Sequence, residues 1–459
     1  MFAVQDEHAS QSLGARLEVA REFGRALGGV ALAPLRAGAY LWRRRAHEEA
    51  VASALGRPAS VAPTPPARAL PRRPLRIFLS SAEPSGELHA LSFASELREL
   101  LRERGAPEPE LVGLGGDASR SAGLRTLGDP VARAAMGFEG VLAALPYYVG
   151  LLADCAEELR RGRTDLFVPV DSPALHVPLA HIAQRAGVRV AHFITPQYWG
   201  WAPWRVGGYR RAVDRALSIL PFEPAWFERH RVPCAHVGHP LLDRLAAVER
   251  GERAKSDRSD TLLLLPGSRA GVCAKNLPFM LAAAARLRVW HPALSVEIAL
   301  AHHDLLQPAR EAVEQAGARA WAHPIVGELH PCLRRARAAM AVSGTVLIDV
   351  LHHRLPSVVL YRLGNARQSW MYRNLLTTPW FASPNLLAGE EVLPEYCFHG
   401  SGPLMEVCVA LERCYKDPSW RESCRDGLER AAQRLGPPGA ARRAAEQALE
   451  LLPGAEEAR

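Results

Sequence analysis

The chain has 459 residues, 48% of them hydrophobic and 23% charged, a balance that excludes a chain disordered throughout. At about 150 residues per domain, this length predicts two or three domains. The formal net charge of +8 comes from 56 basic and 48 acidic residues, and nearly all the basic ones are arginines. This modest excess suits an anionic membrane surface or a phosphorylated substrate, and we expect no nucleic-acid partner.

Signals for targeting, disulfides and metals are missing from the pattern. Residues 1–10 carry no basic region followed by an apolar stretch, so we expect no signal peptide. No uninterrupted apolar run reaches the roughly 18 residues of a spanning helix. Eight cysteines without a C-x-x-C pair are typical of reduced thiols in a cytoplasmic protein. The 17 histidines have no carboxylate or cysteine at ligand spacing, and we expect no metal site.

Residues 1–73 differ in composition from the rest and are expected to form an N-terminal extension. Residues 28–40 are apolar and punctuated by glycines, and three arginines follow at positions 43–45. Arginines beyond an apolar helix face are typical of an interfacial helix. The residues near that face are Leu35, Ala39 and Trp42. A loosely ordered extension with incidental helix is the alternative, and residues 57–74, rich in Pro, Ala and Arg, predict an extended linker.

Between residues 74 and 245, short apolar segments alternate with stretches of helical periodicity. The first strand-like segment is at residues 75–80. The others are Glu110–Gly113, Leu166–Val170, Val188–Ile194 and Ala216–Ile219. This alternation predicts a parallel sheet with helices on both faces.

A second series of the same kind follows, with strands expected at residues 261–265, 295–301 and 338–342. We therefore expect an α/β protein of two doubly wound, Rossmann-like domains, 74–245 and 246–459, the second ending in helices. Ligands of such sheets bind at the carboxyl ends of the strands, and a cleft between the domains is the expected place for a site.

Two candidate sites follow strands of the first series. In the loop Glu83–Glu87, the small residues Ser85 and Gly86 let a ligand approach a helix start whose N–H groups can bind an anion, and Glu87 suits the helix dipole. A tight turn is the alternative. Asp171 ends the strand Leu166–Val170, where its carboxylate is placed to act as a general base on a hydroxyl. The alternative is a cap on the next helix.

A segment rich in tryptophan and arginine follows. Trp199, Trp201 and Trp204 lie close to Arg205, so they can stack on a sugar or base, or contact acyl chains and phosphates. A helix packed into the core is the alternative, although the glycines and prolines between these residues disfavour it.

Two anion cradles are expected in the second series. Gly267, Ser268 and Arg269 follow a hydrophobic strand and lack the Walker pattern, yet they can hold a diphosphate through backbone amides, a hydroxyl and a guanidinium. Ser343, Gly344 and Thr345 also lie between a strand and a helix, and Asp349 one turn on can bind ribose hydroxyls.

Taken together, these motifs resemble those of the lipid-A-disaccharide synthase family, inverting glycosyltransferases of the two-domain GT-B architecture. The similarity runs from about residue 76 to about residue 411. Its motifs are AEPSGE (82–87), GLGG (113–116), AVDRALSILPFE (212–223), VGHPLLD (237–243), LLPGSR (264–269), SGT (343–345), YR (361–362) and PNLLAG (384–389).

The resemblance implies transfer of 2,3-diacylglucosamine from its UDP derivative to 2,3-diacylglucosamine 1-phosphate, with release of UDP and no cofactor. Asp171 matches the candidate base. The donor-nucleotide residues implied by the match, besides the two cradles, are Asp349, Arg362 and Asn385. The implied partners are these two lipids and the cytoplasmic face of the inner membrane, where the protein would be peripheral, and a homodimer is an open alternative.

This chain departs from the family pattern in the expected site at Glu87, Ala174, His176, Ala202 and Asp349. Two alternatives therefore stay open. One is a UDP-sugar transferase or epimerase with a different acceptor. The other is a membrane-associated protein that binds a nucleotide sugar without turnover.

Overall fold

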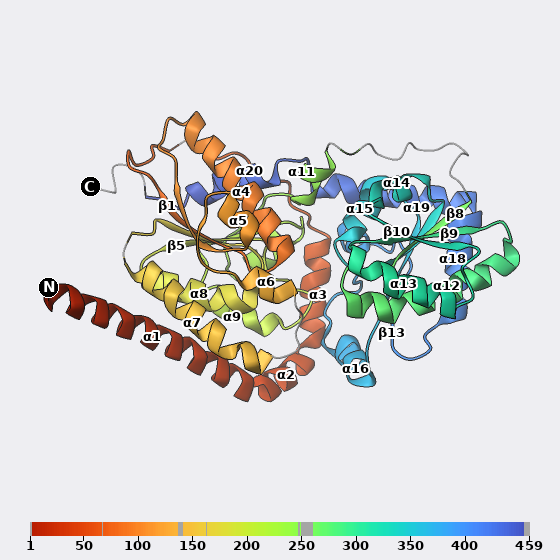
Figure 1. Ribbon diagram of the computed structural model, residues 1–459, viewed down its shortest axis with the longest axis horizontal. Helices are drawn as coiled ribbons and strands as arrows, with labels where there is room; N and C mark the ends of the chain where they lie inside the picture. Colours follow the sequence, from red (N-terminus) through yellow and green to blue (C-terminus); the bar gives the residue numbers. More distant parts are fainter. Residues whose placement is uncertain are drawn as a thin grey trace. The chain divides into compact units, whose positions relative to one another are not determined.

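The computed structural model describes residues 2–66, 68–135, 141–161, 163–246, 248 and 260–453, with only the backbone of residues 2–12, 133–135 and 141–144. The chain divides into two compact units (Figure 1). Unit 1 contains Met1–Pro240 and Pro437–Arg459, and unit 2 contains Leu241–Gly436. Residues 247 and 249–259, next to the domain boundary expected at 245/246, lie outside the described residues.

The described part of unit 1 contains a seven-stranded parallel sheet in the order β3-β2-β1-β4-β5-β6-β7. Its strands are β1 (Arg76–Ser80), β2 (Glu110–Leu114), β3 (Arg125–Gly128), β4 (Leu166–Pro169), β5 (Arg189–Phe193), β6 (Arg215–Ser218) and β7 (Cys234–His236). The order reverses between β1 and β4, so this doubly wound sheet has its switch point at their carboxyl ends.

Helices cover both faces of this sheet. They are α4 (Pro84–Glu103), α5 (Asp117–Ser121), α6 (Pro130–Ala135), α7 (Val141–Arg160), α8 (Pro173–Arg185), η1 (Pro203–Arg205), α9 (Val206–Tyr209), α10 (Glu223–Arg229) and α20 (Ala440–Leu449). Helix α20 lies beside α4, and α7 beside α8 (Figure 1). Ala444, Ala445 and Ala448 of α20 belong to the core of unit 1. The C-terminal helix therefore packs with the first sheet, whereas the sequence placed it with the second.

The N-terminal extension is helical. It forms α1 (Phe2–Ala31), α2 (Ala33–Trp42) and α3 (Arg44–Leu55), of which α1 packs on α7 and α3 on α10. The Pro-rich segment that follows is held to unit 1 by its backbone, because the Ala59 N–H donates to Pro221 O (2.7 Å) and the Ala62 N–H to His236 O (2.6 Å). Where it is described, the extension is a part of unit 1.

Unit 2 is built on a six-stranded parallel sheet, counted over its described residues, in the order β10-β9-β8-β11-β12-β13. The strands are β8 (Thr261–Leu265), β9 (Ser295–Leu300), β10 (Ala322–Val326), β11 (Ala338–Val342), β12 (Ser357–Arg362) and β13 (Glu395–Phe398). The switch point lies between β8 and β11.

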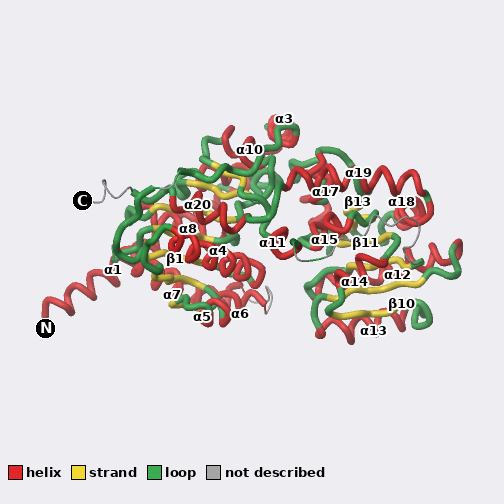
Figure 2. Tube along the Cα trace, turned by 90° about the horizontal axis from the view of Figure 1, so that it is seen from above, coloured by secondary structure: helices red, strands yellow, loops and turns green. Residues whose placement is uncertain are grey.

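The helices of unit 2 flank this sheet, whose strands are yellow in Figure 2. They are α11 (Leu241–Leu245), α12 (Ala270–Trp290), η2 (His303–Leu305), α13 (Leu306–Gln315), α14 (Leu329–Arg335), α15 (Val346–His353), α16 (Ala366–Leu375), α17 (Ser383–Ala388), α18 (Leu404–Lys416) and α19 (Pro418–Leu435). The two sheets and their helices confirm the predicted fold class. No helix within the described ranges is long and apolar enough to cross a membrane.

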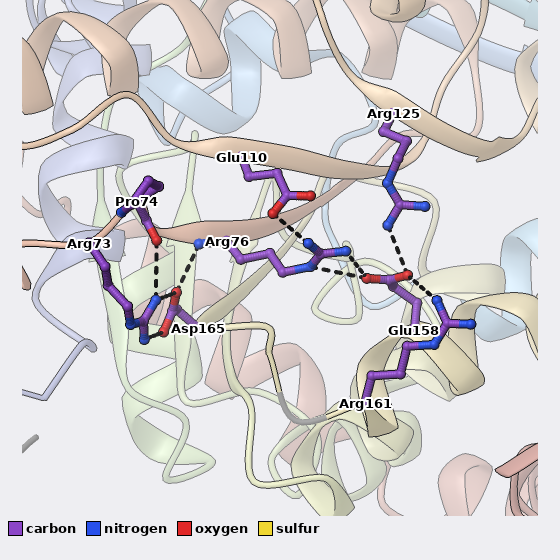
Figure 3. A network of polar contacts seen from close by, with 8 residues as sticks. All are labelled: Arg73, Pro74, Arg76, Glu110, Arg125, Glu158, Arg161 and Asp165. Carbon is purple, nitrogen blue, oxygen red and sulfur yellow. Dashed lines mark hydrogen bonds and ion pairs between the residues drawn. The ribbon is translucent and has the colours of Figure 1, made fainter. Parts of the chain in front are cut away.

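An ionic network closes the amino ends of the unit 1 strands (Figure 3). Glu158 of α7 is 2% exposed and accepts hydrogen bonds from Arg76 (Nε, 3.1 Å) and Arg125 (Nη2, 2.9 Å). Burial alone would raise the pKa of Glu158, but these guanidinium groups outweigh it and lower the pKa. Asp165 accepts from the Arg76 N–H (2.8 Å) and pairs with Arg73. These contacts stabilise the sheet at the end opposite its switch point.

Candidate active site

In unit 1, the expected site residues after β1 and β4 lie side by side. The two strands are hydrogen-bonded neighbours, with Ser80 paired to Pro169, and the ladder continues through Val170 N to Ser80 O (2.9 Å). Gly86, in the first turn of α4, faces the end of β4, since a Cβ there would lie 3.6 Å from Val170 O. The start of α4 and Asp171 therefore share the switch point of the sheet.

The backbone at Asp171 is held in a rare conformation. Asp171 and Ser172 have φ angles of 55° and 45°, the left-handed region that costs a non-glycine residue about 1–3 kcal/mol. Two histidine ring nitrogens bind the Asp171 carbonyl oxygen, His176 Nδ1 at 2.6 Å and His192 Nε2 at 3.1 Å. The Asp171 N–H donates to Phe193 O at 2.9 Å. Both sides of this residue are thus fixed by neighbouring elements.

Both histidines are buried and neutral near pH 7. Burial lowers the pKa of His176 to about 4 and that of His192 to about 3. A neutral imidazole has one N–H, so each ring donates that hydrogen to the Asp171 carbonyl. The remaining nitrogen of His176, Nε2, lies 2.8 Å from Ser80 Oγ and accepts its hydroxyl hydrogen. Ser80, His176 and the Asp171 carbonyl therefore form a chain with a defined tautomer.

The Asp171 carboxyl group has a raised pKa. Burial raises its pKa above the ordinary 3.8, and the nearby Glu83 carboxylate adds to this, while the Ser172 N–H opposes it. Two buried hydroxyls make no hydrogen bond: Ser172 Oγ, next to Asp171 in sequence, and Ser81 Oγ, directly after the neighbouring strand β1. The N-cap of α8 is Ser172, which differs from the alternative in which Asp171 caps that helix.

Glu87 is turned away from this switch point. Its Oε1 accepts three hydrogen bonds, from Gly116 N (2.7 Å), Ser119 N (3.0 Å) and Ser119 Oγ (2.7 Å). A Cβ at Gly116 would lie 3.0 Å from this carboxylate, so a side chain there would crowd Glu87. Glu87 therefore stabilises the start of α5, a structural role in place of the substrate contact expected from the sequence. Ser85 is exposed in the first turn of α4.

The tryptophan-rich segment divides into a buried and an exposed part. Trp199 is 3% exposed and donates its indole N–H to Glu223 (2.9 Å), a carboxyl whose pKa burial raises to about 7. Trp199 therefore belongs to the core of unit 1, which corrects its expected role in substrate binding. Trp201 is 49% exposed, and the Arg205 guanidinium lies 5.4 Å from its ring centre. This exposed cation–π pair is available to a ligand.

In unit 2, the two expected cradles lie at one switch point. Strands β8 and β11 are neighbours, with Leu265 paired to Ala341, so the loops after them are adjacent. Gly267 has a φ of 107°, and a Cβ on it would lie 2.8 Å from Val272 Cγ1, so only glycine fits. The exposed residues of the two loops are Ser268, Arg269, Gly344 and Thr345, with Ser343 half-buried.

Helices α12 and α15 both start at this point. The side chains of their N-cap residues, Arg269 and Thr345, make no cap hydrogen bond. The Val272 N–H of α12 and the Leu347 N–H of α15 donate to backbone oxygens of the first turn, so an anion such as a diphosphate would bind the N–H groups before them and the positive ends of the helix dipoles.

Asp349, in the first turn of α15, lies beneath the cradle rather than on its surface. It is 8% exposed, and its Oδ1 lies 4.0 Å from His330 Nε2. Burial raises the pKa of Asp349 to about 6, and Arg244 of α11 opposes this shift.

The remaining two expected nucleotide residues differ from one another. Arg362 ends β12 and is tied to α12, since its N–H donates to Asn276 Oδ1 (2.9 Å) and its Nη1 to Lys275 O (3.3 Å). Asn385 is fully buried, and its amide bonds Leu393 and Val392 backbone groups at 2.8–2.9 Å. Its hydrogen-bonding capacity is used inside unit 2, which corrects the expectation that it contacts substrate.

No group of His, Cys, Asp or Glu able to hold a metal occurs among the described residues.

Two doubly wound sheets, each with polar loops at its switch point, define the class of fold: a two-domain, GT-B-like architecture. Solved structures of this architecture match most of the chain. A co-structure of S. aureus MnaA with UDP has a TM-score of 0.51 and 12% identity, covering 80% of this chain and 94% of that one. A putative UDP-N-acetylglucosamine 2-epimerase from Listeria monocytogenes has a TM-score of 0.52 and 12% identity, covering 82% and 95%. These similarities support the fold alone.

Sequence similarity identifies the family. Residues 77–436 match the family described as Lipid-A-disaccharide synthetase. The Lipid-A-disaccharide synthase of Myxococcus xanthus is 33% identical over 387 residues, 83% of this chain and 98% of that protein. That of Azotobacter vinelandii is 30% identical over 385 residues, 82% and 98%. The chain belongs to the lipid-A-disaccharide synthase family, the glycosyltransferases of lipid A biosynthesis.

Proposed function

We propose that this chain transfers 2,3-diacylglucosamine from its UDP derivative to 2,3-diacylglucosamine 1-phosphate, forming a β-1,6-linked disaccharide and UDP. Membership of the family supports the class of reaction. The observation that carries the proposal is the Asp171 carboxyl, half-buried at the switch point of unit 1 with a raised pKa and a fixed backbone. Such a carboxylate is a better base than an ordinary exposed one.

In the proposed reaction, Asp171 takes the proton of the acceptor 6-hydroxyl as its oxygen attacks the anomeric carbon of the donor. The bond from that carbon to the diphosphate oxygen breaks as the new glycosidic bond forms. Because attack and departure occur on opposite faces of the sugar, the α-linked donor gives a β-linked product. The electron pair of the broken bond leaves with UDP.

The negative charge that develops on the diphosphate needs stabilisation, and unit 2 offers it. We propose that the first N–H groups of α12 and α15 bind it, together with Arg269 and the hydroxyls of Ser268 and Thr345. Preorganised amides of this kind can stabilise a leaving group without a metal. Asp349 lies beneath these loops, where it would orient them or reach the ribose.

Unit 1 would bind the acceptor. Ser85 and the start of α4 are near Asp171, and the exposed pair of Trp201 and Arg205 suits a sugar face or a lipid phosphate. Both substrates carry acyl chains, so we propose that the protein acts as a peripheral protein at the cytoplasmic face of the inner membrane.

A different acceptor is the second candidate, favoured by two positions. Ala174 stands in the first turn of α8, and Ala202 is 1% exposed, where the family pattern has an acidic residue and an arginine. Incubation with UDP-2,3-diacylglucosamine and a panel of acceptors, followed by mass spectrometry, decides between them. A disaccharide phosphate from the diacylated acceptor supports the main proposal. Product formed only with another acceptor contradicts it. So does the absence of both product and UDP release.

A further inference from the structure

Helix α1 presents large apolar side chains to solvent along one stripe. The apolar stripe comprises Leu13 (61% exposed), Leu17 (63%), Phe23 (43%), Leu27 (57%) and Val30 (73%). With Ala20 between them, these positions follow one another at intervals of three or four residues, so they share one face of the helix. A helix that packs on a globular protein normally turns such a face inward.

The acidic face of α1 is the one that packs on unit 1. Glu22 is 5% exposed and lies 2.8 Å from Arg185 of α8, and Glu18 accepts from the Arg185 Nε at 2.6 Å. Ala15 and Val19 are buried on the same side. These ion pairs set the rotation of the helix about its axis, so the outward direction of the apolar stripe is a built feature.

Helix α2 continues this exposed surface. Tyr40 anchors it, 2% exposed with its ring centre 5.4 Å from that of Trp204. Leu35 is 72% exposed and Trp42 is 82% exposed, with the Arg43 guanidinium 5.7 Å from the Trp42 ring centre. A tryptophan beside an arginine is typical of the boundary between acyl chains and lipid headgroups.

The charges around these apolar residues have one sign. Between residues 13 and 45, the acidic residues are Glu18 and Glu22, and both face unit 1. The exposed charged side chains in this range are Arg16, Arg21, Arg25, Arg36, Arg43 and Arg45. An outward face of apolar side chains and arginines is complementary to anionic phospholipid. The apolar side chains match the acyl chains, and the arginines match the negative headgroups.

We propose that α1 and α2 lie in the surface of a bilayer that contains anionic phospholipid. The apolar stripe and Trp42 would enter the acyl boundary, and the arginines would contact headgroup phosphates. This deepens the proposed function by naming the element that binds the membrane. It rests on the proposed function only for the identity of that membrane. The observations that carry it are the inward ion pairs and the outward apolar stripe.

The test is sedimentation of the full chain with vesicles of phosphatidylcholine, alone or mixed with phosphatidylglycerol. We expect binding to the mixed vesicles and weaker binding to the neutral ones. Leu17→Glu with Leu27→Glu should reduce the vesicle-bound fraction at least about tenfold, because two side chains lose their apolar surroundings and two acids are added. The matched control, Val289→Glu with Val409→Glu, changes two exposed valines of unit 2 (73% and 47% exposed) and should bind as the unchanged chain does.

Melting curves show whether each variant is folded, and no sugar substrate is present, so the result is independent of turnover. A folded Leu17→Glu, Leu27→Glu protein that binds the mixed vesicles as well as the unchanged chain overturns the proposal. So does light scattering that shows a dimer of the unchanged chain, a monomer of this variant and no vesicle binding by either, because the apolar stripe would then meet a second copy. Loss of turnover in an Asp171→Asn protein that still binds vesicles separates the two proposals.

Discussion

His176 Nδ1 lies 2.6 Å from the carbonyl oxygen of Asp171, five residues earlier in the chain. This contact bridges the turn between β4 and α8, in which both Asp171 and Ser172 have positive φ angles. Without such contacts the left-handed turn would relax, and the Asp171 carboxyl would move with it. His176 is thus a positioning residue, and His192 supports the same oxygen from β5.

A His176→Gln substitution should therefore lower kcat with little effect on UDP affinity. A misplacement of the base by about 1 Å costs up to about 10²-fold in rate. The comparison is with His181→Gln, because His181 is also buried on α8 and its pKa is likewise lowered to about 4. Equal loss of kcat in both variants would show that only the packing of α8 matters.

Arg269 should contribute to binding of the UDP moiety. Calorimetry of Arg269→Ala with UDP is expected to show about tenfold weaker binding or more, because a hydrogen bond from a charged donor contributes about 1.5–3 kcal/mol. Arg286→Ala serves as the control, since Arg286 is an exposed arginine further along the same helix, α12. UDP affinity that is unchanged in Arg269→Ala contradicts the proposed place of the diphosphate.

The Glu158 network should stabilise unit 1 in a pH-dependent way. The folded-state pKa of Glu158 is lowered, so its contribution is present above the unfolded pKa of about 4.3 and is lost as the pH falls through the lower folded value. Glu158→Gln should reduce the free energy of unfolding at pH 7 by about 2 kcal/mol, because three guanidinium groups each lose a hydrogen bond to its buried carboxylate.

Urea unfolding at pH 7 and at low pH checks this, and the difference between the proteins should shrink in acid. Glu157→Gln is the control, since Glu157 makes one ion pair with Arg161 on the surface and should matter by less than about 1 kcal/mol. A Glu158→Gln protein as stable as the unchanged chain at pH 7 would contradict the stabilising role.

The alternation of strands and helices was enough to predict two parallel sheets and the positions after β1, β4, β8 and β11 where polar loops gather. It did not predict the strands β3, β7, β10, β12 and β13, which are short or lie at the sheet edges or next to them. Local pattern does not specify which sheet a terminal helix joins, so α20 was assigned to the wrong unit. Its alanine face fits the surface of α4, and no periodicity reveals this contact, since Arg442 of α20 and Glu103 of α4 are 339 residues apart.

The site was predicted less completely, because residue type does not show which way a side chain points. Glu87 and Asn385 stand in the expected motifs, yet their polar atoms bind backbone groups of distant loops. Trp199 and Trp201 are two residues apart, yet Trp199 is buried and donates its indole N–H to the buried Glu223 carboxyl, whereas Trp201 is exposed. The sequence held one signal for the fixed turn at Asp171: Ser172-Pro173 directly after a strand.

The most direct measurement of the central claim is turnover of Asp171→Asn with both acylated substrates across pH. The amide cannot accept the hydroxyl proton, so kcat should fall by roughly 10²–10⁴-fold while UDP affinity stays the same. In the unchanged chain, the acid limb of kcat/KM should lie above pH 3.8, because burial raises the pKa of this carboxyl and the base forms only above it. An Asp171→Asn protein that keeps the full rate, with the same acid limb, would contradict the claim that Asp171 is the base.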